Sequence, residues 1–594
     1  MLPSGGVTFA KLIVHAILAG IYGGLVVALL LVLGNPGAAS RGGGAGLSLL
    51  LVVLLYALAA GLVWPLLYAG VRFFASHPLR LPWLSLRYLV GFHAVNTAVI
   101  LAAGWVMLSE HRAALAPRDA ERLAGACLWL SLAWLVGAVI TVVPRLRRRA
   151  WAQAAAGGTA LAALLVAASG GIPAPATETL MTGALLPPHA GAPGSLTPPA
   201  GDRPIPRAPA GIRPPGTSAA AAAIRRAPAA RSLLLLNFDG ADLDTVLTMH
   251  AQGKLPAFSR FIQEGACGRL VPIRPCVAPL TRTSLVTGML PYRHGVRATQ
   301  VLSVLGRDPW LGVTPPGIGF DLVLSPVLAR RSMEVSDRST PALWEIATRM
   351  GLTMEAAGWD ADLDVDGPAP PGAGPEWVAD LLDPEASRPD DPAARALVAE
   401  LARAAAADEE VIGALRRAAG GHGRRIAAFS FPGLDRVAHV FLRYARPADF
   451  GNVTGREVDL YGQVLERYYQ KIDAIVGAAL QPDPGETLVL VTSTHGIEPL
   501  ALGRRFLKEL TGGGPWSGVH PRGPGGFLLA LGPNIRRGYL FGKGSLTDVA
   551  PSALYALGLP VARDSDGAIL TSLFSETYTA SHPVTVVESY GKVR

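Results

Sequence analysis

The sequence predicts an α/β domain, with a mostly parallel sheet covered by helices on both faces, preceded by an all-α transmembrane region. Two contrasting patterns predict this fold class. Apolar residues are concentrated in residues 1–172, in runs of about 20 residues, the length that a helix needs to cross a membrane. From residue 231 onward, short apolar runs alternate with amphipathic segments, as strands and helices alternate in a parallel sheet.

Five apolar runs in the first region are long enough to span a bilayer. They cover residues 9–33, 47–70, 86–108, 124–144 and 151–171. A soluble helical bundle would need polar helix faces, and these runs have almost none. The first run could instead be a cleaved signal peptide, but its apolar core is too long and further runs follow it. We therefore predict about five transmembrane helices over residues 1–172.

Loop charges predict the orientation of these helices, because cytoplasmic loops carry an excess of arginine and lysine. The loops richest in arginine, within residues 71–87 and 145–149, share a side with the N-terminus. We expect a multi-pass membrane protein with a cytoplasmic N-terminus and an extracytoplasmic domain after residue 172. Much of the net charge of +9 is arginine in membrane flanks and the segment that follows, which suits anionic lipid headgroups. No signature of nucleic-acid binding accompanies it.

The rest of the chain divides where its composition changes. Residues 173–230 are dense in Pro, Ala and Gly, which predicts a semi-rigid, mostly disordered linker. Residues 231–594 form the predicted α/β domain, in which residues 300–425 include cap or insert segments over the site. Cys267 and Cys276 would either pair in an extracytoplasmic domain or remain buried thiols.

The elements of this domain follow from the spacing of apolar residues. Strands are predicted for RSLLLLNFDG, RRIAAFSFPGLD, ETLVLVTSTHG and GGFLLALGP. Helices are predicted for KLPAFSRFIQEG, TPALWEIATRMG, REVDLYGQVLERYYQKIDAIVGAAL and TDVAPSALYALG.

Candidate ligands for a metal ion follow three of these strands. Asp239, His495 and the pair Asp435 and His439 all come where a strand ends, and the carboxyl ends of parallel strands share one edge of a sheet. The D-x-x-x-H spacing places Asp435 and His439 one helical turn apart, so both can face one cation. His520, in a loop before the last long strand, would add a third ligand. Carboxylate and imidazole together suit zinc or a similar divalent ion.

Several motifs in this region occur together and in a known order. They are NFDGADLD, LPAFSRFIQEGA, SLVTGMLPYRHGV, PGLDRVAHVF, YYQKIDAIVG, TSTHGIEP, GVHPRGPGGFLLALGPNI and LTDVAPSALYALGLPVARDSDGAIL. The region from residue 231 to about residue 574 thereby resembles the alkaline phosphatase superfamily, and within it the type I phosphodiesterase/nucleotide pyrophosphatase group. The resemblance implies the alkaline-phosphatase-like fold and a site with two zinc ions that activate a Thr or Ser nucleophile.

The same resemblance assigns metal ligands to positions of this chain. One metal site would consist of Asp435, His439 and His520. The other would use Asp239, His495, the acid immediately before that histidine, and the nucleophile. Two of these positions depart from the pattern: Thr494 replaces the acid, and Ala278 stands where the nucleophile is expected.

Both departures weaken the same metal site, which would keep only Asp239 and His495. We therefore expect one zinc or other divalent ion, with the second site weak or empty. Thr281 could replace the nucleophile if the loop is remodelled, or be an ordinary helix residue or cap. Metal-bound hydroxide attacking directly is a further alternative. Asp242 is expected to stabilise a helix N-terminus as an acid of the first turn rather than replace the missing acid.

Two functions remain open at this point. The first is a membrane-anchored, metal-dependent hydrolase or transferase, of phosphodiesterase or phosphatase type, that acts on a phosphate-containing small molecule or a lipid headgroup. The second is an inactive pseudoenzyme that keeps the fold and part of the metal site and binds a ligand or protein partner at the membrane.

Overall fold

The structure is a computed structural model of the chain. It describes residues 9–36, 44–74, 86–142, 229–306, 308, 310–314, 327–360, 374–383, 385–386, 391–419, 423–481, 485–500, 516–520 and 522–593. The predicted fifth span and almost all of the predicted linker lie outside these residues. The statements below concern the described residues only.

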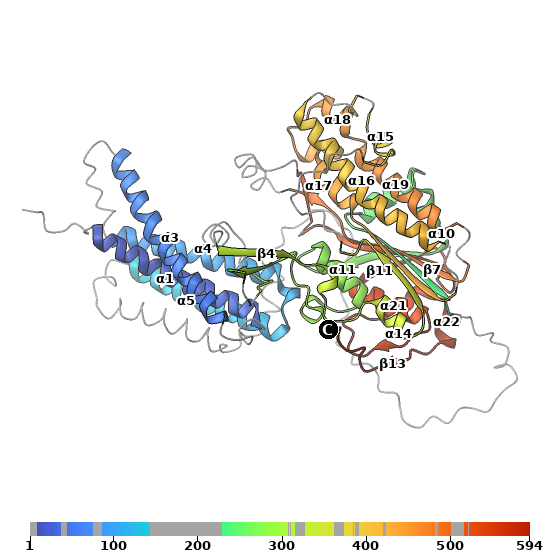
Figure 1. Cartoon of the computed structure of the whole chain (residues 1–594), viewed down its shortest axis with the longest axis horizontal. Helices are drawn as coiled ribbons and strands as arrows, with labels where there is room; N and C mark the ends of the chain where they lie inside the picture. The colour runs from blue at the N-terminus through green and yellow to red at the C-terminus, as the bar shows by residue number, and fades with distance from the viewer. Residues whose placement is uncertain are drawn as a thin grey trace, which may run out of the picture.

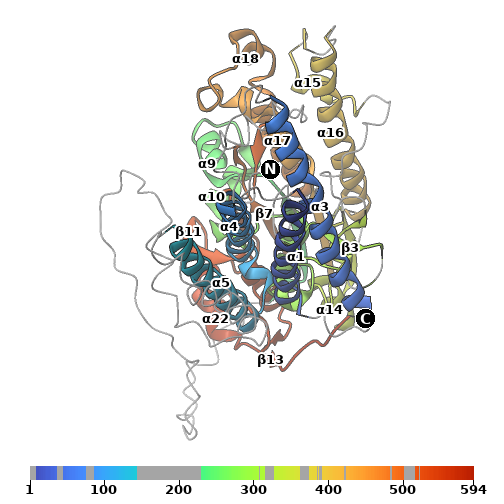
Figure 2. The same ribbon diagram turned by 90° about the vertical axis from the view of Figure 1, so that its left-hand side faces the viewer.

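Four long helices form the N-terminal region, where the first four spans were predicted. They are α1 (Phe9–Gly34), α3 (Gly44–Phe74), α4 (Leu86–Glu110) and α5 (Pro117–Val142). They lie side by side in both views (Figure 1 and Figure 2), with α1 packed against the other three. Within the described residues, two segments are long and apolar enough to cross a membrane, Ala16–Gly34 and Gly46–Val63. Multi-pass insertion and the orientation of the helices stay predictions.

A seven-stranded, mostly parallel sheet is the centre of the second region. Its strands are β1 (Ser232–Phe238), β2 (Ala266–Val271), β5 (Thr353–Ala357), β6 (Arg425–Phe431), β7 (Thr487–His495), β10 (Gly525–Leu531) and β11 (Tyr539–Ser545), in the order β11-β2-β10-β7-β1-β6-β5. Strand β10 runs antiparallel to both of its neighbours, and the other pairings are parallel. All four predicted strands lie in this sheet.

Helices cover both faces of the sheet, as predicted (Figure 1). One core lies beneath α9 (Leu243–Ala251), α10 (Pro256–Glu264), α15 (Val378–Leu381), α16 (Pro392–Ala418), α17 (Gly433–Ala445), α18 (Gly455–Tyr461) and α19 (Val464–Ala479). The other lies beneath α11 (Ala278–Thr287), α14 (Leu343–Arg349), α21 (Val549–Ala556) and α22 (Glu576–Ser581). Because side chains alternate along a strand, Leu233 and Leu235 of β1 enter the second core, while Leu236 and Phe238 enter the first.

A hairpin outside the main sheet connects the two regions. It consists of β3 (Gln300–Val304) and β4 (Leu328–Ser332), and its apolar side chains pack with those of α1, α4 and α5. Asn35, just after α1, reinforces this contact. Its amide donates to the carbonyl of Val313 at 2.6 Å and accepts from the backbone amide groups of Gly312 and Val313 at 3.0 Å. The α/β domain therefore contacts the helical region directly.

Candidate metal centre

The candidate ligands come together at one edge of the sheet. Asp239 directly follows β1, His495 ends β7, and α17, which carries Asp435 and His439, begins just after β6. His520 precedes β10, but β10 is antiparallel to β7 and pairs Gly525 with His495. The chain entering β10 therefore lies at the same edge as the carboxyl ends of the parallel strands.

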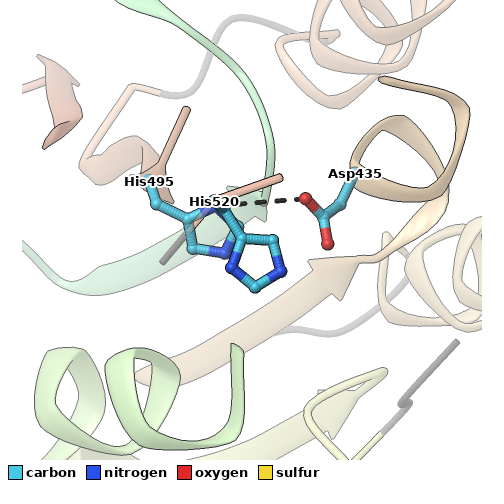
Figure 3. A group of neighbouring side chains, drawn as sticks. All are labelled: Asp435, His495 and His520. Carbon is cyan, nitrogen blue, oxygen red and sulfur yellow. Dashed lines mark ion pairs between the residues drawn. The ribbon is translucent and has the colours of Figure 1, made fainter. Parts of the chain in front are cut away.

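Asp435, His495 and His520 form a buried cluster that could hold a metal ion (Figure 3). One ligand atom from each lies within 4.8 Å of the others. His439 lies beside them, with its Nε2 3.7 Å from Oδ2 of Asp435 and its ring centroid 4.9 Å from that of His520. The predicted set Asp435, His439 and His520 is thus brought together, and His495 lies in the same cluster.

Backbone carbonyl groups fix the orientation of two of these histidines. The Nδ1 atom of His439 lies 2.7 Å from the carbonyl oxygen of Gly518, and Nδ1 of His520 contacts the carbonyl oxygen of Cys276. A carbonyl accepts only, so Nδ1 must carry the proton in both rings. Nε2 is therefore the nitrogen of each ring that could bind a metal ion.

His495 has the most unusual environment in the cluster. Its side chain is fully buried, and neither ring nitrogen makes a hydrogen bond to any described residue. Burial, followed by the neighbouring His520, lowers the pKa of His495 to about 4, so the ring is neutral near pH 7. A buried, neutral imidazole whose nitrogens lack hydrogen bonds fits a metal ligand, since buried polar atoms otherwise have partners.

The approach of Asp435 to β1 depends on Gly240. This residue has a φ of +78°, and a Cβ there would lie 2.6 Å from the Cα of Asp435. Its backbone amide also donates to the carbonyl oxygen of His495 at 3.1 Å. The glycine that follows the acid in NFDG thus lets two parts of the cluster approach each other.

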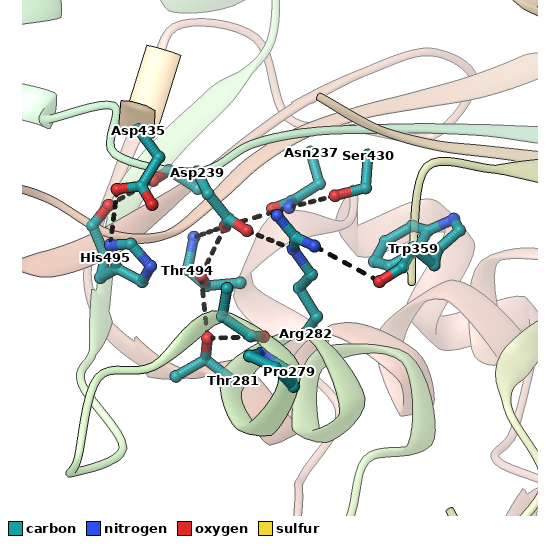
Figure 4. A network of polar contacts seen from close by, with 12 residues as sticks. Asn237, Asp239, Pro279, Thr281, Arg282, Trp359, Ser430, Asp435, Thr494 and His495 are labelled. Carbon is teal, nitrogen blue, oxygen red and sulfur yellow. Dashed lines mark hydrogen bonds and ion pairs between the residues drawn. The ribbon is translucent and has the colours of Figure 1, made fainter. Parts of the chain in front are cut away.

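Asp239 lies beside the cluster but has different neighbours (Figure 4). Its Oδ2 forms an ion pair with Nε of Arg282 at 2.5 Å. Its Oδ1 accepts from the hydroxyl of Thr494 at 2.5 Å and from the amide of Asn237 at 3.1 Å. Burial alone would raise the pKa of Asp239, but the Arg282 charge, with smaller contributions from His495 and Thr494, lowers it to about 2.

The expected nucleophile position and its predicted substitute both lie in α11. Ala278 is the first residue of the helix and has no hydroxyl. Thr281 is fully buried, and its Oγ1 lies 3.0 Å from the hydroxyl of Thr494 and 3.1 Å from the carbonyl oxygen of Val277. The Thr281 hydroxyl thus belongs to the Asp239 network, and its role as a nucleophile stays a prediction.

Two smaller expectations concern residues near the site. Asp242 is the N-cap of α9, where its carboxylate accepts from the backbone amide of Thr245 at 3.0 Å, as expected. Cys267 and Cys276 are buried free thiols and form no disulfide.

Arg282 is the residue of this site that the sequence did not reveal. It follows a threonine in the segment APLTRTSLVT, and nothing in its spacing distinguishes it from a surface arginine. One signal was available: the other residues of this segment are apolar or carry hydroxyl groups. In the structure the whole helix is buried. A lone charge in such a helix calls for a buried partner.

Comparison with known proteins finds one matching family model. The family model for type I phosphodiesterase/nucleotide pyrophosphatase matches residues 233–529, half of the chain. No curated protein matches the chain. Solved structures that it resembles include murine ectonucleotide pyrophosphatase/phosphodiesterase 5, in an inactive form in complex with AMP, and the human protein of the same name. Each is 14% identical with a TM-score of 0.36, and the match covers 58% of this chain and 100% of the other.

Proposed function

Because this chain belongs to the type I phosphodiesterase/nucleotide pyrophosphatase family, we propose that it binds a phosphate ester at one divalent metal ion next to the membrane. The observation that carries the proposal is the cluster of Asp435, His439, His495 and His520, with two imidazoles oriented by carbonyl groups and a third whose nitrogens make no hydrogen bonds. One carboxylate with several imidazoles suits zinc. A zinc ion bound there would polarise a phosphate oxygen and lower the pKa of a bound water.

The nucleophilic chemistry of the family is not part of the proposed function. Ala278 offers no hydroxyl, and the Thr281 hydroxyl is directed toward Thr494 and the helix backbone. Thr494 in turn donates to Asp239, which has a pKa of about 2 and is therefore a poor general base near neutral pH. We infer that the domain recognises phosphate esters without forming a covalent intermediate.

Hydrolysis without a protein nucleophile is a second candidate function. The buried cluster of candidate metal ligands favours it, since a divalent ion can promote attack by water on a bound phosphate ester. The two candidates share the same metal and ligand chemistry and differ only in turnover.

The N-terminal helices favour a position at a membrane. Along α3, large apolar side chains are exposed at intervals of three or four residues: Leu47, Leu50, Leu54, Leu58, Leu62 and Leu66. A continuous exposed leucine stripe is unfavourable in water and suits contact with lipid chains. Both a soluble phosphate ester, such as a nucleotide, and a lipid headgroup could therefore reach the domain, and both carry the phosphate that the metal would bind.

The test uses the full chain in detergent micelles. We expect elemental analysis to find one zinc per chain, and expect His439→Ala and His520→Ala to lose it. His250→Ala is the matched control. The His250 ring forms a hydrogen bond with Ser259 and is not one of the candidate ligands, so its loss should leave the zinc count unchanged. Zinc-dependent binding of AMP would support the proposal, and a chain that binds no zinc at saturation would refute it.

Turnover separates the two candidates. The wild type and His439→Ala are assayed with bis(4-nitrophenyl) phosphate, a general phosphodiester, with and without added zinc. Zinc-dependent hydrolysis that His439→Ala abolishes would establish the second candidate. Zinc-dependent AMP binding without hydrolysis would establish the first.

A further inference from the structure

The part of the site around Asp239 does not fit a metal ion. A carboxylate binds a metal through oxygen lone pairs that do not already accept from other donors. Here Oδ1 of Asp239 already accepts from Asn237 and Thr494, and Oδ2 lies 2.5 Å from Nε of Arg282. Both oxygens of Asp239 are thus already engaged by hydrogen-bond donors of the protein.

Arg282 is held firmly in the position from which it meets Asp239. Its side chain is 3% exposed, and its NH1 atom donates to the carbonyl oxygen of Trp359 at 3.4 Å. The indole of Trp359 is in turn fixed by a hydrogen bond to the carbonyl oxygen of Ala428 at 3.0 Å. The guanidinium is therefore anchored on the side away from Asp239 as well as on the side facing it.

The positive charge of Arg282 offsets the net change of charge that the loss of the acid and of the second metal ion would cause. Replacing the expected acid with Thr494 removes one negative charge, and losing a divalent ion removes two positive charges. Arg282 adds one positive charge, so the total charge of the site is unchanged. A site that lost a carboxylate and a metal but gained an arginine would keep its attraction for an anion.

We propose that the Arg282 guanidinium is a built-in cation that takes the place of the second metal ion, so that the domain binds one metal ion and excludes another. The inference rests on the proposed one-metal function for the first ion only. With no second ion to bind, His495 lies against His520, their ring centroids 4.5 Å apart, and its Nδ1 is 3.9 Å from Oδ1 of Asp435. His495 would then be a ligand of the one remaining metal ion.

Zinc stoichiometry of the full chain in detergent tests this proposal. In the double variant Arg282→Met/Thr494→Asp, the guanidinium is removed and the acid is restored. We expect this variant to bind one zinc more per chain than the wild type, measured by elemental analysis after equilibration with excess zinc. An unchanged count in a folded double variant would overturn the proposal.

Two further variants keep the proposal testable if the double variant does not fold. Thr494→Asp alone keeps Arg282 in place, so we expect the wild-type zinc count, and an additional zinc in this variant would refute exclusion by Arg282. Arg282→Met/Asp239→Asn removes the ion pair without leaving a buried charge, and we expect it to fold and keep the wild-type count.

The design separates failure of this inference from failure of the proposed function. The inference depends on differences in zinc count between variants, whereas the one-metal function depends on the count in the wild type. A wild type that binds two zinc ions would overturn the inference. A wild type with no zinc and a double variant with one would overturn the proposed function and support the inference.

Discussion

The two halves of the site solve the same physical problem in opposite ways. Both contain a buried carboxylate close to β1. Around Asp239 the protein supplies a cation and several hydrogen bonds, so the charge is fully compensated. Around Asp435 it supplies imidazoles instead, and His495 makes no hydrogen bond to any described residue. Since buried polar groups need partners, the first half is complete in itself, whereas the unbonded imidazole of His495 in the second half, here called the metal half, fits a ligand.

Restoring the family's chemistry should need changes in both the nucleophile and the cation, which is the largest effect that we predict. Ala278→Thr/Thr494→Asp returns the two missing groups but leaves Arg282 against Asp239. We expect it to hydrolyse bis(4-nitrophenyl) phosphate no faster than the wild type. Adding Arg282→Met should raise the rate by about 100-fold or more, because a second metal stabilises charge on the reacting oxygens. High activity in Ala278→Thr/Thr494→Asp would show that Arg282 does not prevent binding of a second metal ion.

Breaking the Asp239 half from one side should be strongly destabilising. Asp239→Ala leaves the buried Arg282 charge without its carboxylate, and we expect the free energy of unfolding to fall by about 3–5 kcal/mol. Arg282→Met/Asp239→Asn removes both charges and should cost much less. Urea unfolding of the detergent-solubilised chain measures the difference. Equal losses in the two variants would mean that the ion pair is not the source of the effect.

Zinc binding by the half of the site around Asp435 should weaken when the start of α17 is changed. A Cβ at Gly433 would lie 2.0 Å from the hydroxyl oxygen of Tyr468 and 2.4 Å from Oδ2 of Asp408. Gly433→Ala should therefore displace the helix that carries Asp435, cost about 1–3 kcal/mol, and weaken zinc binding. Tyr468→Phe removes the nearest clashing atom and should recover part of the zinc affinity in the combined variant. Unchanged zinc affinity in Gly433→Ala would contradict this account.

The sequence predicted the metal half of the site better than the Asp239 half, for a physical reason. Helical spacing placed Asp435 beside His439, and strand ends placed Asp239 and His495 at one edge of the sheet. The resemblance assigned His495 to the site of Asp239, but the structure places it with Asp435 and His520. The role of Arg282 depends on contacts with residues far along the chain, which no local pattern encodes.

The fold shows the same division between local and distant information. Apolar runs predicted β1, β6, β7 and β10, but not that β10 runs antiparallel. The contact of Asn35 with the segment before β4 was also invisible, because it joins residues 278 positions apart. Direction and docking depend on which distant surfaces meet, and apolar spacing alone does not carry that information.

The smallest effect at acidic pH is expected at Asp408, which contacts the start of α17. Its carboxyl group faces the Tyr468 hydroxyl at 2.8 Å and the backbone amide of Gly433 at 2.8 Å. Burial raises the pKa of Asp408 to about 7, although both hydrogen bonds and the more distant Arg282 oppose the rise. The folded state thus holds a proton that the unfolded chain releases near pH 4.

Stability should therefore decrease as the pH rises from about 4 to about 7, and this contribution should not change further above that range. Asp408→Asn has the shape of the protonated acid and cannot ionise, so it should abolish this dependence. Near pH 4, where both side chains are uncharged in the folded state, we expect it to differ from the wild type by less than about 1 kcal/mol. At pH 7 and 8 we expect Asp408→Asn to be the more stable of the two. Urea unfolding at pH 5, 7 and 8 measures both slopes, and parallel slopes would show that Asp408 is already ionised in the folded domain.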